Sequence, residues 1–126
     1  MGPFQWTPQI AVGNDHIDGQ HRRLLELANE VAEIMATNDY DGILKALDGL
    51  LDYTRVHFRD EEEILRQFGY ADIDQHIAKH HQIIASVDFA WRQRHAMTGE
   101  ELFLIVRDVI LRHITVVDGE YRQIFG

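Results

Sequence analysis

Four stretches of the chain place apolar residues three and four positions apart, which is the spacing of residues on one face of an α-helix. We expect helices at about residues 19–37, 41–68, 72–95 and 99–117. Asn38 and Asp39 break the pattern after the first stretch, and Gly69 ends the second. Four helices of this length with short connections predict an all-α fold, an antiparallel up-down-up-down four-helix bundle.

The residues before the first helix do not follow this spacing. Pro3, Pro8 and Gly13 interrupt the chain there, so we expect an irregular N-terminal arm over residues 1–18. A chain of 126 residues with 45% hydrophobic and 26% charged residues has the size and composition of one globular domain. We therefore expect a single domain over residues 1–126.

Two of the expected helix starts carry the residues of a capping box. In this motif the side chain of the N-cap residue accepts a hydrogen bond from the backbone N–H three residues later. The side chain of that later residue accepts one from the N–H of the N-cap residue. Asp72 has Gln75 three residues on, and Thr98 stands in the same relation to Glu101. Both pairs are expected to cap their helices.

Charge and composition exclude several classes of protein. The formal net charge is -9 and no run of Lys or Arg occurs, so we expect neither nucleic acid nor a membrane surface as a partner. No segment has the length of a membrane span or the pattern of a secretory signal, which indicates a cytoplasmic protein. The chain has no cysteine, which excludes iron–sulfur clusters and thiolate nucleophiles. Any metal must therefore be held by nitrogen and oxygen.

Polar residues interrupt the apolar faces of all four expected helices. These residues are His21, His57, Glu61, His76, His80 and His113. A buried charge or hydrogen-bonding group without a partner costs several kcal/mol, and the apolar faces offer no central Lys or Arg to pair with Glu61. Three other histidines, His16, His81 and His95, fall outside the apolar faces and are expected at the surface.

The spacing of these residues predicts that they converge. Residues four apart on a helix are about 6 Å apart along the axis and about 40° apart around it. His57 with Glu61, and His76 with His80, can therefore point toward one place, as metal ligands do in helix bundles. A single histidine on an apolar face is usually a hydrogen-bonded core residue, but five on four faces indicate a metal site. A hydrogen-bonded polar core remains the alternative.

Several metals accept such a donor set. Histidine and carboxylate ligands suit zinc, iron, copper or manganese. Five histidines and a carboxylate exceed what one tetrahedral zinc ion takes, so the count implies either two metal ions or one large polar cluster.

Four motifs resemble those of the hemerythrin family, in particular its single-domain bacterial members. The motifs are Val12-Gly13 with Ile17-Asp18-Gly19-Gln20-His21, His57-Phe58-Arg59-Asp60-Glu61-Glu62, His76-Ile77-Ala78-Lys79-His80, and His113-Ile114 followed by Asp118 and Tyr121. The resemblance extends from Trp6 to Tyr121 and includes seven ligand positions at matching spacings.

The resemblance implies a complete set of ligands for two iron ions. His76, His80 and His113 would hold one iron, and His21 and His57 the other. Glu61 and Asp118 would bridge the pair together with an oxo or hydroxo group. This leaves one open position, on the iron with two histidines, where dioxygen fits.

The function implied is reversible dioxygen binding for storage, delivery or sensing, which is binding rather than catalysis. Dioxygen is the implied partner, and no protein partner is indicated. Four residues are expected to wall the oxygen pocket: Leu25, Phe58, Val109 and Ile110.

Two positions depart from what the resemblance requires. On an ideal helix Asp118 lies about 140° around from His113, so the helix must loosen or end between them, and Gly119 makes a break there plausible. Val109 stands where the family commonly has a tryptophan, which leaves the expected oxygen pocket roomier.

Other functions fit parts of the pattern. A di-iron enzyme that activates dioxygen, peroxide or nitric oxide would also use a four-helix bundle, and weak oxidase or peroxidase activity is its mildest form. Ferritin-like enzymes use Glu-x-x-His pairs, and no glutamate here has a histidine three residues later. An oxygen or redox sensor module cut from a signalling protein and a zinc-binding structural bundle are further alternatives.

Overall fold

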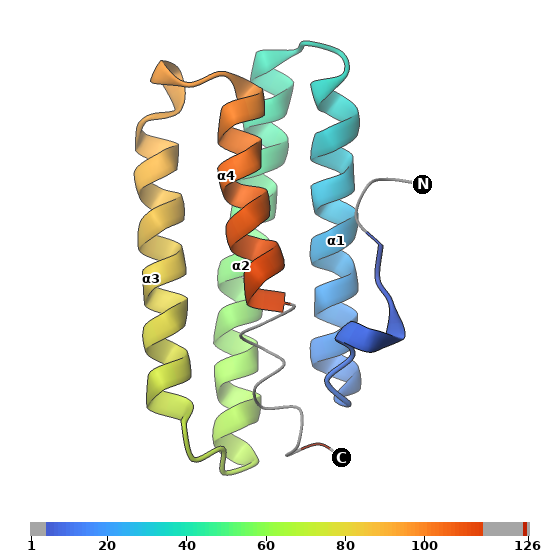
Figure 1. Cartoon of the computed structure of the whole chain (residues 1–126), viewed down its shortest axis with the longest axis vertical. Coiled ribbons are helices and arrows are strands. Elements are labelled where there is room, and N and C mark those ends of the chain that lie inside the picture. The colour runs from blue at the N-terminus through green and yellow to red at the C-terminus, as the bar shows by residue number, and fades with distance from the viewer. Residues whose placement is uncertain (1–4, 115–124, 126) are drawn as a thin grey trace.

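A computed structural model describes residues 5–114 and residue 125, with only the backbone of residues 110–112. This part of the chain contains four α-helices, two short 3₁₀ helices and no strand. The α-helices are α1 (Asp15–Met35), α2 (Tyr40–Gln67), α3 (Ile73–Arg92) and α4 (Gly99–Arg112), and the 3₁₀ helices are η1 (Pro8–Ile10) and η2 (Arg94–Ala96). Successive α-helices run in opposite directions (Figure 1), so the expected antiparallel four-helix bundle is confirmed.

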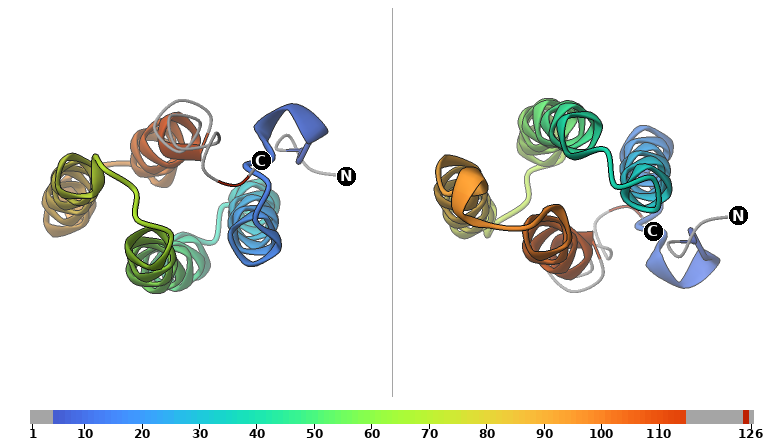
Figure 2. Two further views of the ribbon diagram at one scale, coloured as in Figure 1. Left: turned by 90° about the horizontal axis from the view of Figure 1, so that it is seen from below. Right: turned by 90° about the horizontal axis from the view of Figure 1, so that it is seen from above.

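The four helices enclose one common interior. Seen along the bundle axis, each helix lies beside the next one in the chain, and α4 returns beside α1 (Figure 2). Every helix can therefore direct one face toward the same central space. This arrangement is what allows side chains from distant parts of the sequence to meet.

The first helix begins earlier than its apolar spacing indicates. α1 starts at Asp15 rather than near residue 19 because Asn14 is its N-cap, with the side-chain oxygen accepting a hydrogen bond from the Ile17 N–H at 3.0 Å. The Asp18 carboxylate accepts two further bonds, from the N–H groups of Val12 at 2.9 Å and Gly13 at 3.3 Å. The irregular arm thus ends at Asn14, and the expectation that it continues to residue 18 is wrong.

The two expected capping boxes behave differently. Glu101 donates its N–H to the Thr98 hydroxyl, and the Thr98 N–H donates to the Glu101 carboxylate, each at 3.0 Å. Asp72 makes no side-chain capping bond, so this second expectation is wrong. The backbone of Asp72 lies at φ -95°, ψ 26°, outside the extended conformation from which an N-cap side chain reaches the next turn.

The other helix boundaries differ from expectation by a few residues. α3 ends at Arg92 instead of residue 95, because residues Arg94–Ala96 form the separate turn η2. α4 keeps its regular form to Arg112, and His113 and Ile114 then lie in a wider π-type turn. Residues 115–117, which the sequence assigns to the last helix, lie outside the described residues.

Apolar residues fill the interior in two clusters. The larger one occupies the turns of α1 and α2 between Leu24 and Leu51 together with the facing parts of α3 and α4. The smaller one contains Val12, Ile17 and Leu65 at the other end of the bundle. Along α1 and α2 the polar residues His21, His57 and Glu61 lie between these clusters, so they are enclosed by apolar packing on both sides.

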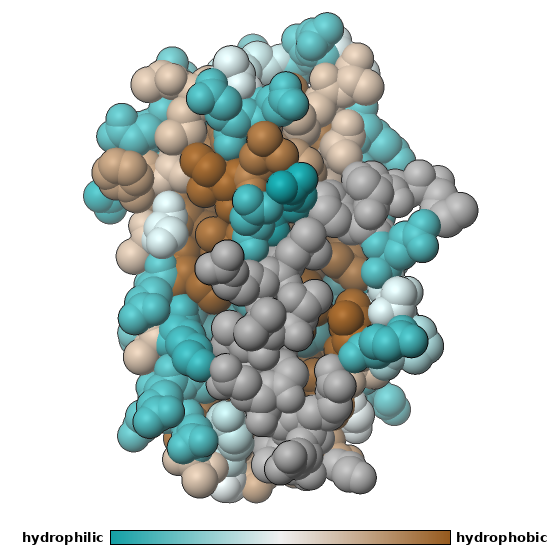
Figure 3. All heavy atoms as spheres, in the orientation of Figure 1, coloured by the Kyte–Doolittle hydropathy of each residue, from teal (hydrophilic) through white to brown (hydrophobic). Residues whose placement is uncertain are grey.

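The surface between α3 and α4 is partly apolar. Apolar residues gather over the upper parts of these two helices, whereas polar residues cover the lower part of α3 (Figure 3). Leu104 and Ile105 on α4 are among the exposed large apolar residues. Among the described residues, no helix has the length and hydropathy needed to span a membrane.

Candidate metal centre

Six of the expected ligand residues meet in the bundle interior. Each is at most 2% exposed, although a histidine or glutamate is seldom buried to that extent. They come from three helices and the turn after the fourth: His21 from α1, His57 and Glu61 from α2, His76 and His80 from α3, and His113 directly after α4.

One oxygen of Glu61 faces three histidines. Oε1 lies 2.5 Å from the Nε2 of His76, 3.1 Å from that of His80 and 3.7 Å from that of His113. These four residues place ligand atoms within 4.8 Å of one another. They form a compact group of three imidazole nitrogens and one carboxylate oxygen.

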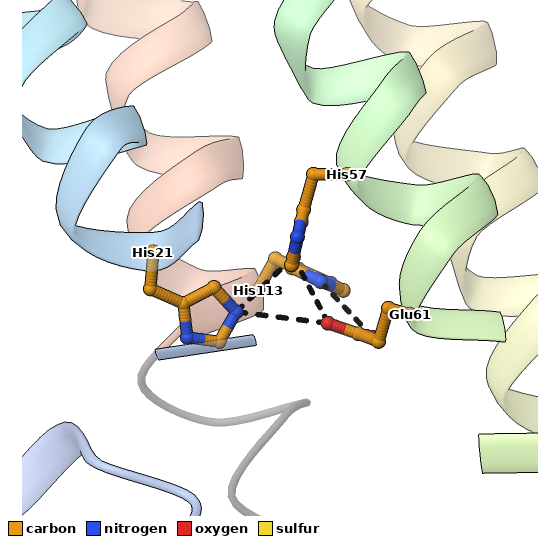
Figure 4. Close-up of side chains that lie close together, drawn as sticks. All are labelled: His21, His57, Glu61 and His113. Carbon is orange, nitrogen blue, oxygen red and sulfur yellow. Dashed lines mark hydrogen bonds and ion pairs between the residues drawn. The ribbon is translucent and has the colours of Figure 1, made fainter. Parts of the chain in front are cut away.

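The other oxygen of Glu61 faces two histidines. Oε2 lies 2.9 Å from the Nε2 of His57 and 3.6 Å from the Nε2 of His21, and these two nitrogens are 3.1 Å apart. His113 also contributes to this second group of possible ligands, which Figure 4 shows converging on one point. Glu61 therefore lies between two histidine groups and presents one oxygen to each.

The donor atoms have the spacing that a bound metal requires. A metal–nitrogen bond of about 2.1 Å puts neighbouring ligands of an octahedral ion about 3 Å apart. The separations of His57 Nε2 from Glu61 Oε2 and from His21 Nε2, and of His80 Nε2 from Glu61 Oε1, are 2.9, 3.1 and 3.1 Å. These residues fit metal ions in both groups without rearrangement of the helices.

The electrostatic surroundings of Glu61 also favour a cation beside it. Burial opposes ionisation of Glu61, but the positive charge of His57 and hydrogen bonds from His113, His21 and His57 outweigh it and hold the pKa of Glu61 well below its ordinary value of 4.5. The charge of His57 and these hydrogen bonds together keep the carboxylate ionised. A metal ion held by these histidines and Glu61 would place positive charge at the same point.

Sequence reasoning missed two residues that bond the outer nitrogens of the histidines. Gln20 Oε1 lies 2.7 Å from His57 Nδ1, and Glu62 Oε2 lies 2.8 Å from His80 Nδ1. Gln20 is almost fully buried, which is unusual for a glutamine. Neither residue lies on the apolar faces that led to the other six.

The residues expected to wall an oxygen pocket have different surroundings. Phe58 is 2% exposed and stacks on His80, while Leu25 is buried in the larger apolar cluster. Val109 is half-buried and lines, with His113, a groove of about 600 Å³ between α3 and α4. The side chain of Ile110 lies outside the described residues.

The remaining expectations concern the last ligand and the surface histidines. Asp118 lies outside the described residues, so its assignment still rests on the sequence motif. The helix loosens at His113 and Ile114, within the interval where the sequence requires a change in geometry. His16, His81 and His95 are exposed, as expected.

A four-helix bundle that directs five histidines and a glutamate into its interior belongs to the class of metal-binding helix bundles. The sequence profile of the hemerythrin HHE cation binding domain matches residues 12–123. The chain therefore belongs to the hemerythrin family.

Known proteins are similar over nearly the whole chain. A bacteriohemerythrin of Methylococcus capsulatus is 32% identical over 125 residues, which cover 96% of this chain and 95% of that protein. One of Stenotrophomonas maltophilia is also 32% identical over 125 residues, which cover 96% of this chain and 80% of that protein. The crystal structure of a wild-type hemerythrin superimposes with a TM-score of 0.86 at 28% identity, covering 98% of both chains. The crystal structure of a leucine-to-alanine variant of hemerythrin superimposes with a TM-score of 0.87 at 29% identity, covering 99% of this chain and 98% of the variant's chain.

Proposed function

We propose that this protein binds dioxygen reversibly at a non-haem centre of two iron ions. The observation that carries the proposal is the position of Glu61, whose two oxygens face two histidine groups of unequal size. A single metal ion would leave one of these groups without a cation. Membership of the hemerythrin family supports iron over the other metals that accept the same donors.

The proposed ligands divide between the two irons. His76, His80 and His113 hold one, and His21 and His57 hold the other. Glu61 would contribute to holding both, since each of its oxygens lies beside one group. Asp118 is proposed as a second carboxylate that would be shared by the two irons, on its place in the sequence motif.

The chain's own residues determine where a small ligand binds. The reduced iron pair supplies the two electrons that dioxygen binding requires. The group with two histidines offers fewer protein donors than the group with three, so the open position is proposed on that side. Leu25 and Phe58 are buried and apolar, and such walls limit the access of water and protons to a bound ligand. This shielding would favour release of the ligand over its loss by protonation.

The proposal is tested by iron analysis and by the ultraviolet–visible spectrum of one sample. We expect about two irons per chain, a colourless reduced form under anaerobic conditions, and charge-transfer bands that appear in air and disappear under vacuum. Two irons without a reversible band would contradict dioxygen binding but keep the di-iron centre. Zinc, or no metal, would overturn the di-iron centre itself.

One observation favours a second candidate function, a di-iron enzyme acting on peroxide or nitric oxide. The groove between α3 and α4 is larger than a diatomic ligand needs, and Val109 leaves it open as far as His113. It reaches the group with three histidines, however, where protein donors leave the least room. Catalytic consumption of peroxide or nitric oxide by the iron-loaded protein would favour the enzyme.

A further inference from the structure

A short hydrogen-bonded chain connects the surface to His57. Gln20 Nε2 donates to Asp60 Oδ2 at 2.8 Å, and Gln20 Oε1 faces His57 Nδ1 at 2.7 Å. An ionised carboxylate only accepts hydrogen bonds, so Asp60 fixes which end of the Gln20 amide points away from His57. The amide oxygen that remains can only accept, and His57 Nδ1 must therefore carry a hydrogen.

The consequence falls on the other nitrogen of His57. With the hydrogen on Nδ1, the Nε2 of a neutral His57 carries a lone pair, and it lies 2.9 Å from Glu61 Oε2. A lone pair facing a carboxylate oxygen at that distance is stable only with a cation beside both. Gln20 thus prepares His57 as a metal ligand without touching the metal position.

The same arrangement occurs on His80, with one chemical difference. Glu62 Oε2 accepts from His80 Nδ1 at 2.8 Å, so Nε2 again carries the lone pair toward Glu61, at 3.1 Å. The acceptor is a carboxylate here and a neutral amide on His57. A histidine that donates to a carboxylate becomes the more basic ligand, because the negative charge stabilises the donated hydrogen in its displaced position.

We propose that Gln20 and Glu62 are positioning residues that fix the orientation of His57 and His80 and make the two histidine groups unequal in donor strength. The proposal rests on the proposed di-iron function for its effect on iron, but not for the hydrogen positions. The group with three histidines then stabilises the higher oxidation state of its metal, whereas the group with two leaves its metal the stronger Lewis acid. That second group is the one to which the open position is assigned.

Asp60, which accepts the hydrogen bond from Gln20, has two further neighbours at the surface. Asp60 also has the exposed His16 at 3.5 Å and Arg59 at 3.8 Å. These contacts are long and partly solvated, so their individual contributions to stability are small.

The hydrogen positions are tested on the zinc-substituted protein, which needs no iron chemistry. In the wild type, nitrogen-15 spectra of the imidazoles should show His57 and His80 with hydrogen on Nδ1 and metal on Nε2. Gln20→Leu should lose the His57 Nδ1–H signal and weaken zinc or cobalt binding roughly 10- to 100-fold. Gln67→Leu is the matched control, because it removes an exposed glutamine that bonds Glu63. It should leave the His57 Nδ1–H signal and the metal affinity unchanged.

A charge exchange separates positioning from simple packing. The double variant Gln20→Glu with Asp60→Asn keeps the hydrogen-bonding pattern and net charge but gives His57 a carboxylate acceptor. This double variant should bind metal more tightly than Gln20→Leu, and its iron-loaded form should have a lower reduction potential than the wild type. Glu62→Gln should have a higher reduction potential than the wild type. Unchanged potentials in both, or a Gln20→Leu protein with normal zinc affinity and His57 signals, would overturn the inference while leaving the proposed function intact. A wild type that binds no metal would overturn both.

Discussion

Phe58 lies flat against His80, with ring centroids 4.0 Å apart and ring planes only 5° from parallel. His80 is thereby held on its face by an apolar ring, at its outer nitrogen by Glu62 and beside its inner nitrogen by Glu61. The orientation of this imidazole is fixed before any metal arrives. The same ring of Phe58 lies 4.6 Å from His113, so one apolar side chain supports two proposed ligands of the same iron.

Replacing Phe58 by alanine should therefore affect both stability and the metal site. The loss of a buried aromatic side chain lowers the free energy of unfolding by about 3–5 kcal/mol. Denaturant titration of the metal-free protein measures this effect, with Phe89→Ala as control because Phe89 is 64% exposed. In the iron-loaded protein, faster decay of the oxygenated form is expected as water gains access. Equal stability of the two variants would contradict the packing described.

Acid should destabilise the metal-free protein through Glu61. Because the pKa of Glu61 is lower in the folded than in the unfolded chain, the unfolded chain binds more protons at acid pH. The stabilisation is fully present above the unfolded pKa of about 4.5 and is lost as pH falls toward the folded pKa. Denaturant titrations between neutral and acid pH measure the slope. Glu61→Gln should make that slope shallower, and an unchanged slope would show that other groups cause it.

The two expected capping boxes allow a comparison of helix starts. Thr98→Ala removes a hydroxyl that accepts the Glu101 N–H and should lower the free energy of unfolding by about 1 kcal/mol. Asp72→Ala removes a side chain that makes no capping bond and should have a smaller effect. Thermal unfolding of both variants at neutral pH is sufficient to rank them. A larger loss for Asp72→Ala would mean that its side chain caps α3 in solution.

Filling the groove between α3 and α4 should change ligand lifetime more than fold stability. Val109→Trp places a large ring beside His113, where the groove meets the site. If solvent enters by this route, the oxygenated form should decay more slowly in the variant, as followed by its charge-transfer band in air. Val56→Trp on the exposed face of α2 is the control for the added ring. The same decay rate in both variants and the wild type would show that solvent enters elsewhere.

Much of the fold was predictable because its signals are local and periodic. The apolar spacing located all four helices, and the step of four from His57 to Glu61 and from His76 to His80 indicated which residues share a face. The start of α1 was not predictable in this way, since Asn14 precedes the apolar pattern and its capping role depends on backbone conformation. The failure of Asp72 to cap α3 has the same origin.

The outer hydrogen bonds of the site depend on pairing between helices. Gln20 and Glu62 bond histidines 37 and 18 residues away, and no spacing along one helix reveals such a contact. The hydrogen bond that Asp18 accepts from the Val12 N–H was not predictable either, because Asp18 faces the N-terminal arm instead of the interior. Residues that a helical period places off the apolar face can thus still determine the chemistry of the site.

The wide separation of the proposed ligands along the chain has a consequence for folding. Two metal ions held on either side of Glu61 would connect His21 to His113, positions 92 residues apart, through a few bonds, as a crosslink would. Such an ion binds the folded chain and has little affinity for the unfolded one, so each tenfold rise in free metal above the dissociation constant adds about 1.4 kcal/mol to stability. The melting temperature of this protein is therefore also a gauge of how much metal it carries.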